Sequence, residues 1–263
     1  MSFDVHAGEI FGFPGPSGAG KSTLQKILTG ILKGRSGSVT VMGHEAKEPG
    51  AGFLEDIGVV FGFPTLYAKL TAMESLRFFS SLYKREGLDI MPLLERTGLS
   101  GSAHKRVSSF SKGMKTRLAF VRALLHSPVL LFLDEPTSGF DPANARIIKD
   151  MILEQKWAGR IVILTTHNMH DAHELCDRVA FIVDGKIRAL DTPQALCARE
   201  SGVQVSYAYL DNGQTMTGSA NLSGLGQDEE FMKRLKDGTQ VSRHSKEPSL
   251  EGVFVELTGR CLA

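Results

Sequence analysis

The sequence predicts an α/β fold in which helices cover a doubly wound, mostly parallel β-sheet. Two observations support this prediction, and a third indicates an additional unit. Short apolar runs, such as residues 129–133 and 179–183, have the length and composition of strands buried on both faces. Segments with apolar residues at helical spacing alternate with these runs along the chain. After about residue 200 the chain becomes more polar, with short alternating segments, which predicts a small C-terminal β-rich appendage.

The composition indicates a packed chain and argues against several classes of protein. Of the 263 residues, 42% are hydrophobic and 22% are charged, which suffices for a sizeable core. The 30 lysines and arginines nearly balance the 29 aspartates and glutamates, so we expect no nucleic-acid partner. The longest apolar runs have five residues, whereas a membrane span needs about 20.

The N-terminus and the cysteines indicate a cytoplasmic protein. The first six residues carry no basic-then-apolar signal sequence. Cys176, Cys197 and Cys261 are widely spaced and form no ligand pattern, so we expect ordinary small residues in a reducing compartment.

The first part of the chain predicts strands around a glycine-rich loop. Residues 1–13 are interpreted as the end of a strand, a turn at Ala7-Gly8 and a second strand over residues 9–13. A helix is expected over 21–32, an alternating strand over 38–41 and a more apolar strand over 57–61.

No strand candidate lies between Phe61 and Val129, which predicts an inserted helical subdomain over about residues 70–127. Thr71 and Glu74 form a capping box before a helix over 71–83. Two further helices are expected at residues 89–97 and 115–126.

The next part returns to alternating strands and helices. Asp141 and Pro142 have the residue types of an N-cap and a first helical position. Further elements are expected as a strand at 161–164, a helix at 169–176, and strands at 178–183 and 186–190.

The polar tail predicts a separate unit. Residues 203–244 contain short alternating segments with turns at residues 211–213 and 237–238, and a final helix is expected over 248–258. The charged stretch 228–236 is interpreted as a solvated helix face. We therefore expect a core domain over residues 1–200 and a small accessory domain over 201–263.

Residues 15–23 fit the phosphate-binding loop pattern G-x-x-x-x-G-K-[ST]. Glycines in such a loop let successive backbone N–H groups converge on an anion, and the following helix adds its positive N-terminus. Lys21 is expected to reach the β- and γ-phosphates and the Ser22 hydroxyl to bind a magnesium ion. The alternative is a glycine-rich surface turn before a helix. The expected nucleotide-binding residues are Gly15, Pro16, Ser17, Gly18, Ala19, Gly20, Lys21, Ser22 and Thr23.

Asp134 and Glu135 follow the apolar run 129–133 directly. Functional groups of parallel sheets gather at the carboxyl ends of strands, so we expect Asp134 to hold the metal ion and Glu135 to polarise the attacking water. The alternative is that the acidic pair only caps the next helix.

These motifs, in this order, resemble the nucleotide-binding subunit of an ABC transporter over residues 1 to about 200. The family's signature loop matches residues 111–114, its loop after the acidic strand matches 138–141, and its switch histidine matches His167. Residues 176–179 and 184–187 also resemble the family. The tail segments 247–251 and 257–260 resemble the C-termini of bacterial export-type members.

The resemblance implies a P-loop NTPase of RecA-like fold with an antiparallel β subdomain. It implies ATP and Mg²⁺ as ligands, with Ser22 and Asp134 on the metal and Lys21, Glu135 and His167 as catalytic residues. It also adds Ser111, Lys112, Gly113 and Asp141 to the nucleotide-binding residues.

The resemblance further implies partners and a location. In relatives the signature residues, which open a helix, meet the γ-phosphate bound by a second copy or a homologous ATPase subunit. The pair forms head-to-tail around two ATP and drives a polytopic membrane permease, here for export. Such a chain lies in the cytoplasm, peripheral to the inner face of the membrane.

Three features depart from the family pattern. Gly62 stands where relatives usually have a glutamine that touches magnesium and the membrane partner. Lys112 stands where they often have glycine, a change that export-type relatives tolerate. Only 14 residues precede Gly15, so the chain is expected to begin late. Phe11 and Phe13 are interpreted as core residues, which leaves Phe3 as a substitute for the family's adenine-stacking aromatic.

Three other functions are considered. A soluble ABC-type ATPase acting on ribosomes usually carries two such cores, and one acting on DNA has a long coiled coil, for which the 90 residues from Lys21 to Ser111 leave no room. A catalytically weakened regulatory protein is favoured by Gly62 and the short N-terminus. A small-molecule P-loop kinase leaves residues 109–114 and 138–141 unexplained.

Overall fold

The computed structural model describes residues 1–33, 36–46, 50–62, 65–198, 204–211, 214–236, 240–246 and 248–259. Contacts divide the chain into two compact units, Met1–Leu190 and Asp191–Leu262. Each unit is described by itself. None of the helices in the described residues is long and apolar enough to cross a bilayer.

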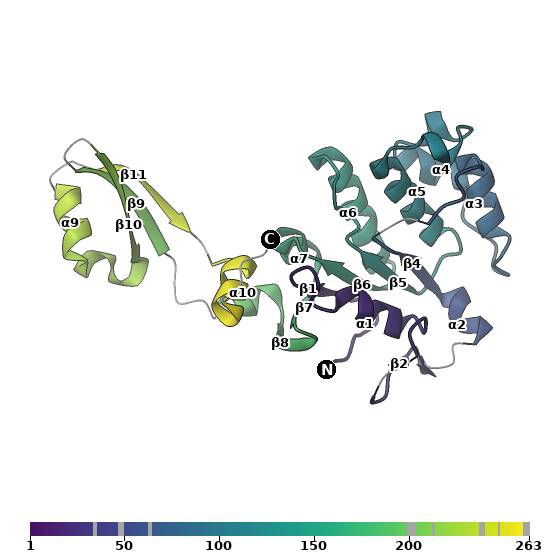
Figure 1. Cartoon of the computed structure of the whole chain (residues 1–263), viewed down its shortest axis with the longest axis horizontal. Coiled ribbons are helices and arrows are strands. Elements are labelled where there is room, and N and C mark those ends of the chain that lie inside the picture. Colours follow the sequence, from purple (N-terminus) through teal and green to yellow (C-terminus); the bar gives the residue numbers. More distant parts are fainter. Residues whose placement is uncertain are drawn as a thin grey trace. The chain divides into compact units, whose positions relative to one another are not determined.

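The first unit is built on a central sheet with the strand order β4-β5-β6-β1-β7-β8 (Figure 1). Every pairing from β4 through β7 is parallel. Its strands are β1 (Ile10–Pro14), β4 (Ile57–Val60), β5 (Leu130–Asp134), β6 (Ile161–Thr166), β7 (Arg178–Val183) and β8 (Lys186–Asp191). A small antiparallel pair is formed by β2 (Thr40–Val41) and β3 (His44–Glu45).

Helices flank this sheet on both faces. The helices of the first unit are α1 (Lys21–Leu28), α2 (Ala51–Asp56), α3 (Ala72–Ser80), α4 (Ile90–Arg96), α5 (Lys112–Leu124), α6 (Pro142–Trp157) and α7 (Met169–Leu175), with 3₁₀ turns η1 (Ser100–Ser102) and η2 (Val107–Ser109). Figure 1 shows α3, α4 and α5 grouped together.

Successive residues of β1 point to opposite faces of the sheet, and both faces are covered. Phe11 and Phe13 are fully buried in one core cluster with Leu24 of α1. Gly12, between them, faces the opposite way, because an added Cβ there would lie 2.5 Å from the sulfur of Cys176 after α7. The predicted doubly wound sheet is therefore confirmed.

The register of the sheet brings three loops together. Pro14 at the end of β1 pairs with Thr166, and Asp134 at the end of β5 pairs with Thr165. Because these strands are parallel, the residues that follow them leave the same edge of the sheet. The loops beginning at Gly15, Glu135 and His167 are thus neighbours.

Several predicted local features are confirmed. Thr71 and Glu74 form a complete capping box, and Asp141 caps α6 with Pro142 at its start. Several predicted bounds need correction. The helix expected over 71–83 spans Ala72–Ser80, and the one expected over 248–258 begins at Leu250. Residues 1–6 form no strand, α1 ends at Leu28, the strand expected over 38–41 is limited to Thr40–Val41, and α5 begins at Lys112 because Ser111 caps it there.

The second unit contains α8 (Pro193–Cys197), β9 (Gln204–Asp211), β10 (Gln214–Asn221), η3 (Leu222–Gln227), α9 (Glu229–Lys236), β11 (Gln240–Lys246) and α10 (Leu250–Thr258). Its antiparallel sheet has the order β10-β9-β11. On one side of β9, Tyr207 packs edge-on against Phe231 of α9, with ring centroids 5.0 Å apart. Asn212, Gly213, Asp237 and Gly238 of the predicted turns, and Cys261, lie outside the described residues.

A buried histidine joins α5 to the sheet. His126 is 1% exposed, its Nε2 lies 2.8 Å from the carbonyl oxygen of Ile57, and its ring stacks on Tyr83 at 3.8 Å. Its Nδ1 has no hydrogen-bond partner in the described part of the chain. Burial lowers the pKa of His126, and the contact with Ile57 only partly opposes this effect.

We predict that His126→Gln makes the free energy of unfolding depend less on pH below about pH 6.5. The folded state disfavours the protonated ring, so wild-type stability is full above the unfolded pKa of about 6.5 and falls as the pH drops below it. Between pH 7.5 and 5.5 the wild type should lose about 1 kcal/mol more than the variant in urea unfolding. The exposed His44→Gln serves as the control. Equal losses in wild type and His126→Gln would contradict the prediction.

Candidate nucleotide-binding site

The glycine-rich loop has the backbone shape that phosphate binding requires. Gly18 and Gly20 have φ of 79° and 102°, in the left-handed region that glycine adopts without strain. Gly15 lies against β7, where an added Cβ would be 2.5 Å from the carbonyl oxygen of Ile182. The loop ends at the N-terminus of α1, so its N–H groups and the helix dipole act on the same point.

Lys21 lies folded over this loop. Its Nζ donates to the carbonyl oxygens of Gly15, at 2.6 Å, and Pro16, at 3.0 Å. Burial lowers the pKa of Lys21, and the nearby carboxylates of Glu135 and Asp134 partly offset the effect. The ammonium group is therefore positioned beside a loop that can accept an anion.

Asp134 ends β5 beside the loop and is 9% exposed. The Thr165 hydroxyl donates to its Oδ1, and the Ser22 hydroxyl donates to its Oδ2 at 3.2 Å. A carboxylate and a hydroxyl at this separation are oxygen donors of the kind Mg²⁺ prefers. The donor set fits a magnesium ion.

Glu135 is held in a strained position next to Asp134. Its φ is 51°, in the left-handed region, which costs a non-glycine residue about 1–2 kcal/mol. His167 Nδ1 lies 2.8 Å from Oε1, and the Thr166 hydroxyl donates to Oε2 at 3.3 Å. Strain of this kind clusters at functional sites, which makes Glu135 a candidate functional residue.

These groups line one open cavity of about 720 Å³. The predicted residues on its wall are Ser17, Gly18, Ala19, Gly20, Lys21, Ser22, Thr23, Lys112, Asp134, Glu135 and His167. Gly62 and Ser138, which the sequence analysis singled out from the family pattern, also lie on this wall. The sequence analysis did not single out four further wall residues, Lys26, Phe61, Thr65 and Thr116. The supporting hydroxyls of Thr165 and Thr166 were also missed, although their place at the end of an apolar run could have indicated them.

Other predicted residues lie outside the described wall of this cavity. Ser111 is exposed and caps α5 by accepting from the N–H of Met114 at 3.2 Å. Gly113 faces the ring of Phe140, from which an added Cβ would be 3.5 Å away. Asp141 is exposed, and hydrogen bonds from Asn144 lower its pKa. Within the described residues, Ser111, Gly113 and Asp141 therefore do not line the cavity of their own chain.

The structure describes two of the departures from the family pattern. Phe3 stacks on Phe11, with centroids 5.6 Å apart, and meets Phe13 edge-on at 5.1 Å. It therefore packs on the core. Gly62 is outside the left-handed region, and an added Cβ would lie 3.4 Å from Asp134 Oδ2. A side chain at position 62 would thus reach the carboxylate of Asp134.

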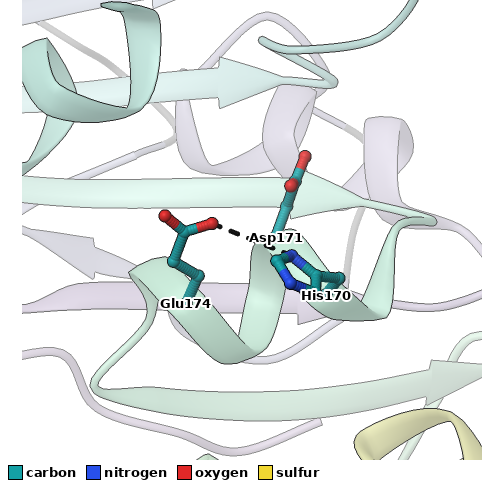
Figure 2. A group of neighbouring side chains, drawn as sticks. All are labelled: His170, Asp171 and Glu174. Carbon is teal, nitrogen blue, oxygen red and sulfur yellow. Dashed lines mark ion pairs between the residues drawn. The ribbon is translucent and has the colours of Figure 1, made fainter. Parts of the chain in front are cut away.

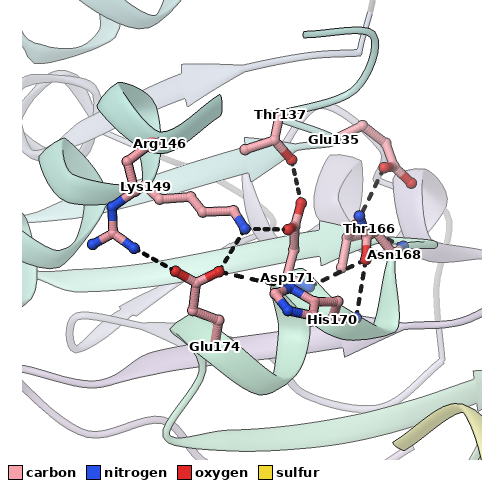
Figure 3. A network of polar contacts seen from close by, with 9 residues as sticks. All are labelled: Glu135, Thr137, Arg146, Lys149, Thr166, Asn168, His170, Asp171 and Glu174. Carbon is pink, nitrogen blue, oxygen red and sulfur yellow. Dashed lines mark hydrogen bonds and ion pairs between the residues drawn. The ribbon is translucent and has the colours of Figure 1, made fainter. Parts of the chain in front are cut away.

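A second group of possible metal ligands lies on α7. Ligand atoms of His170, Asp171 and Glu174 lie within 4.8 Å of one another (Figure 2). Lys149 already contacts both carboxylates, at 2.6 Å from Asp171 and 2.5 Å from Glu174 (Figure 3). Glu174 also pairs with Arg146 at 2.8 Å, so Lys149 and Arg146 together offset the two carboxylates and the cluster is a salt-bridge network.

The chain resembles known proteins over most of its length. A family model described as ABC transporter matches residues 1–138. A fluoroquinolones export ATP-binding protein of Mycobacterium tuberculosis is 51% identical over 100% of this chain and 87% of its own. A Nod factor export ATP-binding protein I of Rhizobium johnstonii is 34% identical over 99% of this chain and 89% of its own.

A solved structure described as the ATP binding subunit of an ABC transporter shares the fold. It matches with a TM-score of 0.70 and 29% identity, over 76% of this chain and 85% of that chain. The family resemblance and the fold class expected from the sequence are therefore confirmed.

We predict that Gly62→Gln lowers the Mg²⁺ concentration needed for half-maximal ATP turnover. Mg²⁺ binds six oxygen ligands and readily keeps waters, so the wild-type site should bind it with a water where relatives supply an amide oxygen. The measurement is a magnesium titration of ATPase rate. Gly101→Gln, at an exposed position with no atom within 4 Å of the new Cβ, is the control for stability. Superimposable curves would mean that position 62 does not serve the metal.

Proposed function

This chain belongs to the ABC transporter family as an ATP-binding subunit, and from that premise we propose that it hydrolyses ATP to drive a separate membrane subunit for export. The observation that carries the proposal is the register of β1, β5 and β6. It brings the phosphate loop, Asp134, Glu135 and His167 to one cavity.

The phosphate loop binds and orients the nucleotide. Its N–H groups and the N-terminus of α1 bind the phosphate oxygens, and Lys21 exchanges its contacts with Gly15 and Pro16 for the β- and γ-phosphates. Ser22 and Asp134 would hold Mg²⁺, which would neutralise charge on the phosphates.

Glu135 acts as the base for hydrolysis. A water molecule gives a proton to its carboxylate while the water oxygen attacks the terminal phosphorus and the bond to ADP breaks. Thr166 and His167 hold the two carboxylate oxygens, so the base meets the water in one orientation. His167 is half-exposed, at 48% of its side chain, and can reach the γ-phosphate in the same cavity.

We predict that Glu135→Gln preserves folding and ATP binding but lowers hydrolysis by a factor of about 10² or more, since a positioned base contributes about 10²–10⁴. Phosphate release measured alongside nucleotide binding tests this, with the exposed Glu95→Gln as the matched control. Comparable hydrolysis by Glu135→Gln would remove Glu135 as the base. Wild-type turnover at background would instead favour a regulatory nucleotide-binding protein, which Gly62 makes the second candidate.

A second ATPase subunit completes the site in this proposal. Ser111 and Gly113 stand at the N-terminus of α5, which offers a hydroxyl, N–H groups and a positive dipole end to an anion. Ser111 lies outside the described wall of its own chain's cavity. A head-to-tail partner, either a second copy or a homologous subunit, would bring its signature residues to the γ-phosphate.

The composite site predicts ATP-dependent dimerisation. The Glu135→Gln protein should dimerise in saturating ATP and return to monomer without it, as measured by light scattering. Adding Ser111→Asp keeps an N-capping residue but places a negative charge toward the partner's phosphate, so it should abolish dimerisation and leave nucleotide binding unchanged. A monomer of Glu135→Gln at saturating ATP, or a dimer that tolerates Ser111→Asp, would count against the composite site.

The relatives support the proposed membrane partner and location. Two of them are named as export ATP-binding proteins, and a structural relative is described as part of an ABC transporter complex. We therefore assign this chain to the inner face of the cell membrane, bound to a polytopic permease. Measuring ATP turnover with and without that permease distinguishes this role from that of a free ABC-type ATPase.

A further inference from the structure

The turn that follows β5 carries both the catalytic carboxylate and the loop matched to residues 138–141. Its internal hydrogen bonds run from Ser138 N to Glu135 O, at 3.1 Å, and from Phe140 N to Thr137 O, at 3.2 Å. These bonds shape the turn but do not attach it to the rest of the unit. Glu135 has a φ of 51°, a conformation that persists only when the surroundings hold it.

One side chain of this turn is attached to α7. The Thr137 hydroxyl donates to Asp171 Oδ2 at 2.5 Å (Figure 3). Asp171 is 5% exposed, and its own N–H donates to Asn168, the N-cap of α7. The acceptor is therefore fixed in position by the start of its helix.

Asp171 belongs to a network of charged side chains on α6 and α7. Lys149 of α6 lies 2.6 Å from Asp171 and 2.5 Å from Glu174, and Glu174 also pairs with Arg146 at 2.8 Å. Burial opposes the charge on Lys149, but its hydrogen bonds to the two carboxylates outweigh burial and raise its pKa. The bond from Thr137 thus reaches a carboxylate, which makes it stronger than a bond between neutral groups.

The residues just before α7 also hold the side-chain carboxylate of Glu135. The N–H of Asn168 donates to the Thr166 hydroxyl at 3.0 Å, and that hydroxyl donates to Glu135 Oε2 at 3.3 Å. His167, one residue earlier than Asn168, pairs with Oε1. The segment from Thr166 to Asp171 therefore contacts Glu135 at its carboxylate and its turn at Thr137.

We propose that Thr137 and Asp171 are positioning residues, whose hydrogen bond locks the turn after β5 so that Glu135 and His167 keep one mutual geometry. This inference rests on the proposed hydrolysis of ATP. Neither residue lines the described wall of the nucleotide cavity, so both act through Glu135.

The hydroxyl of Thr137 can be removed without disturbing the charges. Lys149 and Arg146 offset the charges of Asp171 and Glu174 without using this hydroxyl. Thr137→Val keeps the branched shape, and Thr137→Ser keeps the hydroxyl. A matched control is Thr97→Val, which removes a buried hydroxyl that donates to Leu93 O in α4 at 2.8 Å.

Steady-state ATPase kinetics test the proposal. We expect Thr137→Val to lower kcat about tenfold or more with KM for ATP within about twofold, because misplacing a catalytic group slows chemistry without weakening binding. Thr137→Ser should restore most of the rate, and Thr97→Val should leave it unchanged. In an Asp171→Ala background, Thr137→Val should have little further effect, since the two changes remove the same interaction.

Hydrogen exchange separates failure of this inference from failure of the proposed function. Thr137→Val should increase exchange in peptides covering residues 135–141 and leave the helical subdomain unchanged. The inference would be overturned if Thr137→Val left hydrogen exchange unchanged, or if it left kcat unchanged in a protein that hydrolyses ATP. Additive effects of Thr137→Val and Asp171→Ala on kcat would also overturn it. Wild type without turnover would overturn the proposed function, and the exchange result would still decide whether Thr137 holds the turn.

Discussion

The parallel register of β1, β5 and β6 is the constraint on which the rest of the first unit depends. Pro14 lies opposite Thr166, and Asp134 lies opposite Thr165, so three loops leave the sheet at one edge. A shift of one residue would turn each strand's side chains to the other face and separate the carboxylate of Asp134 from Ser22. The buried phenylalanines of β1 resist such a shift, because they would have to leave the core.

The charged and strained residues of the site are held by hydrogen bonds and ion pairs within it. Lys21 and Asp134 are both less than a tenth exposed, and each has hydrogen-bond partners within the site. Glu135 adopts an unfavourable φ while His167 and Thr166 hold its carboxylate. A buried charge without partners would cost several kcal/mol, so these contacts are a condition for having the site at all.

The departures from the family pattern have different structural meanings. Gly62 lies next to Asp134, and an added Cβ there would be 3.4 Å from Oδ2, so a longer side chain at this position would contact that carboxylate. Phe3 packs on Phe11 and Phe13, which fits a core residue. Phe61 is an aromatic residue on the described wall of the cavity. Lys112 reaches that wall from the start of α5, where relatives often have glycine.

The sequence by itself determined the features that depend on near neighbours. The apolar runs, the capping box of Thr71 and Glu74, the cap at Asp141 and the phosphate loop could all be predicted, because their partners lie within a few residues. Short elements such as α2 and α8 could not be predicted, since six or five residues carry too little periodicity.

Only the tertiary structure decided which distant groups meet. Thr137 and Asp171 are 34 residues apart, and Ser22 and Asp134 are 112 apart. Their pairing follows from strand order and from how α6 and α7 pack, which no local pattern encodes. The sequence determined the chemistry present in the chain, and the sheet determined its geometry, because hydrogen bonds between side chains form only after the strands have set the register.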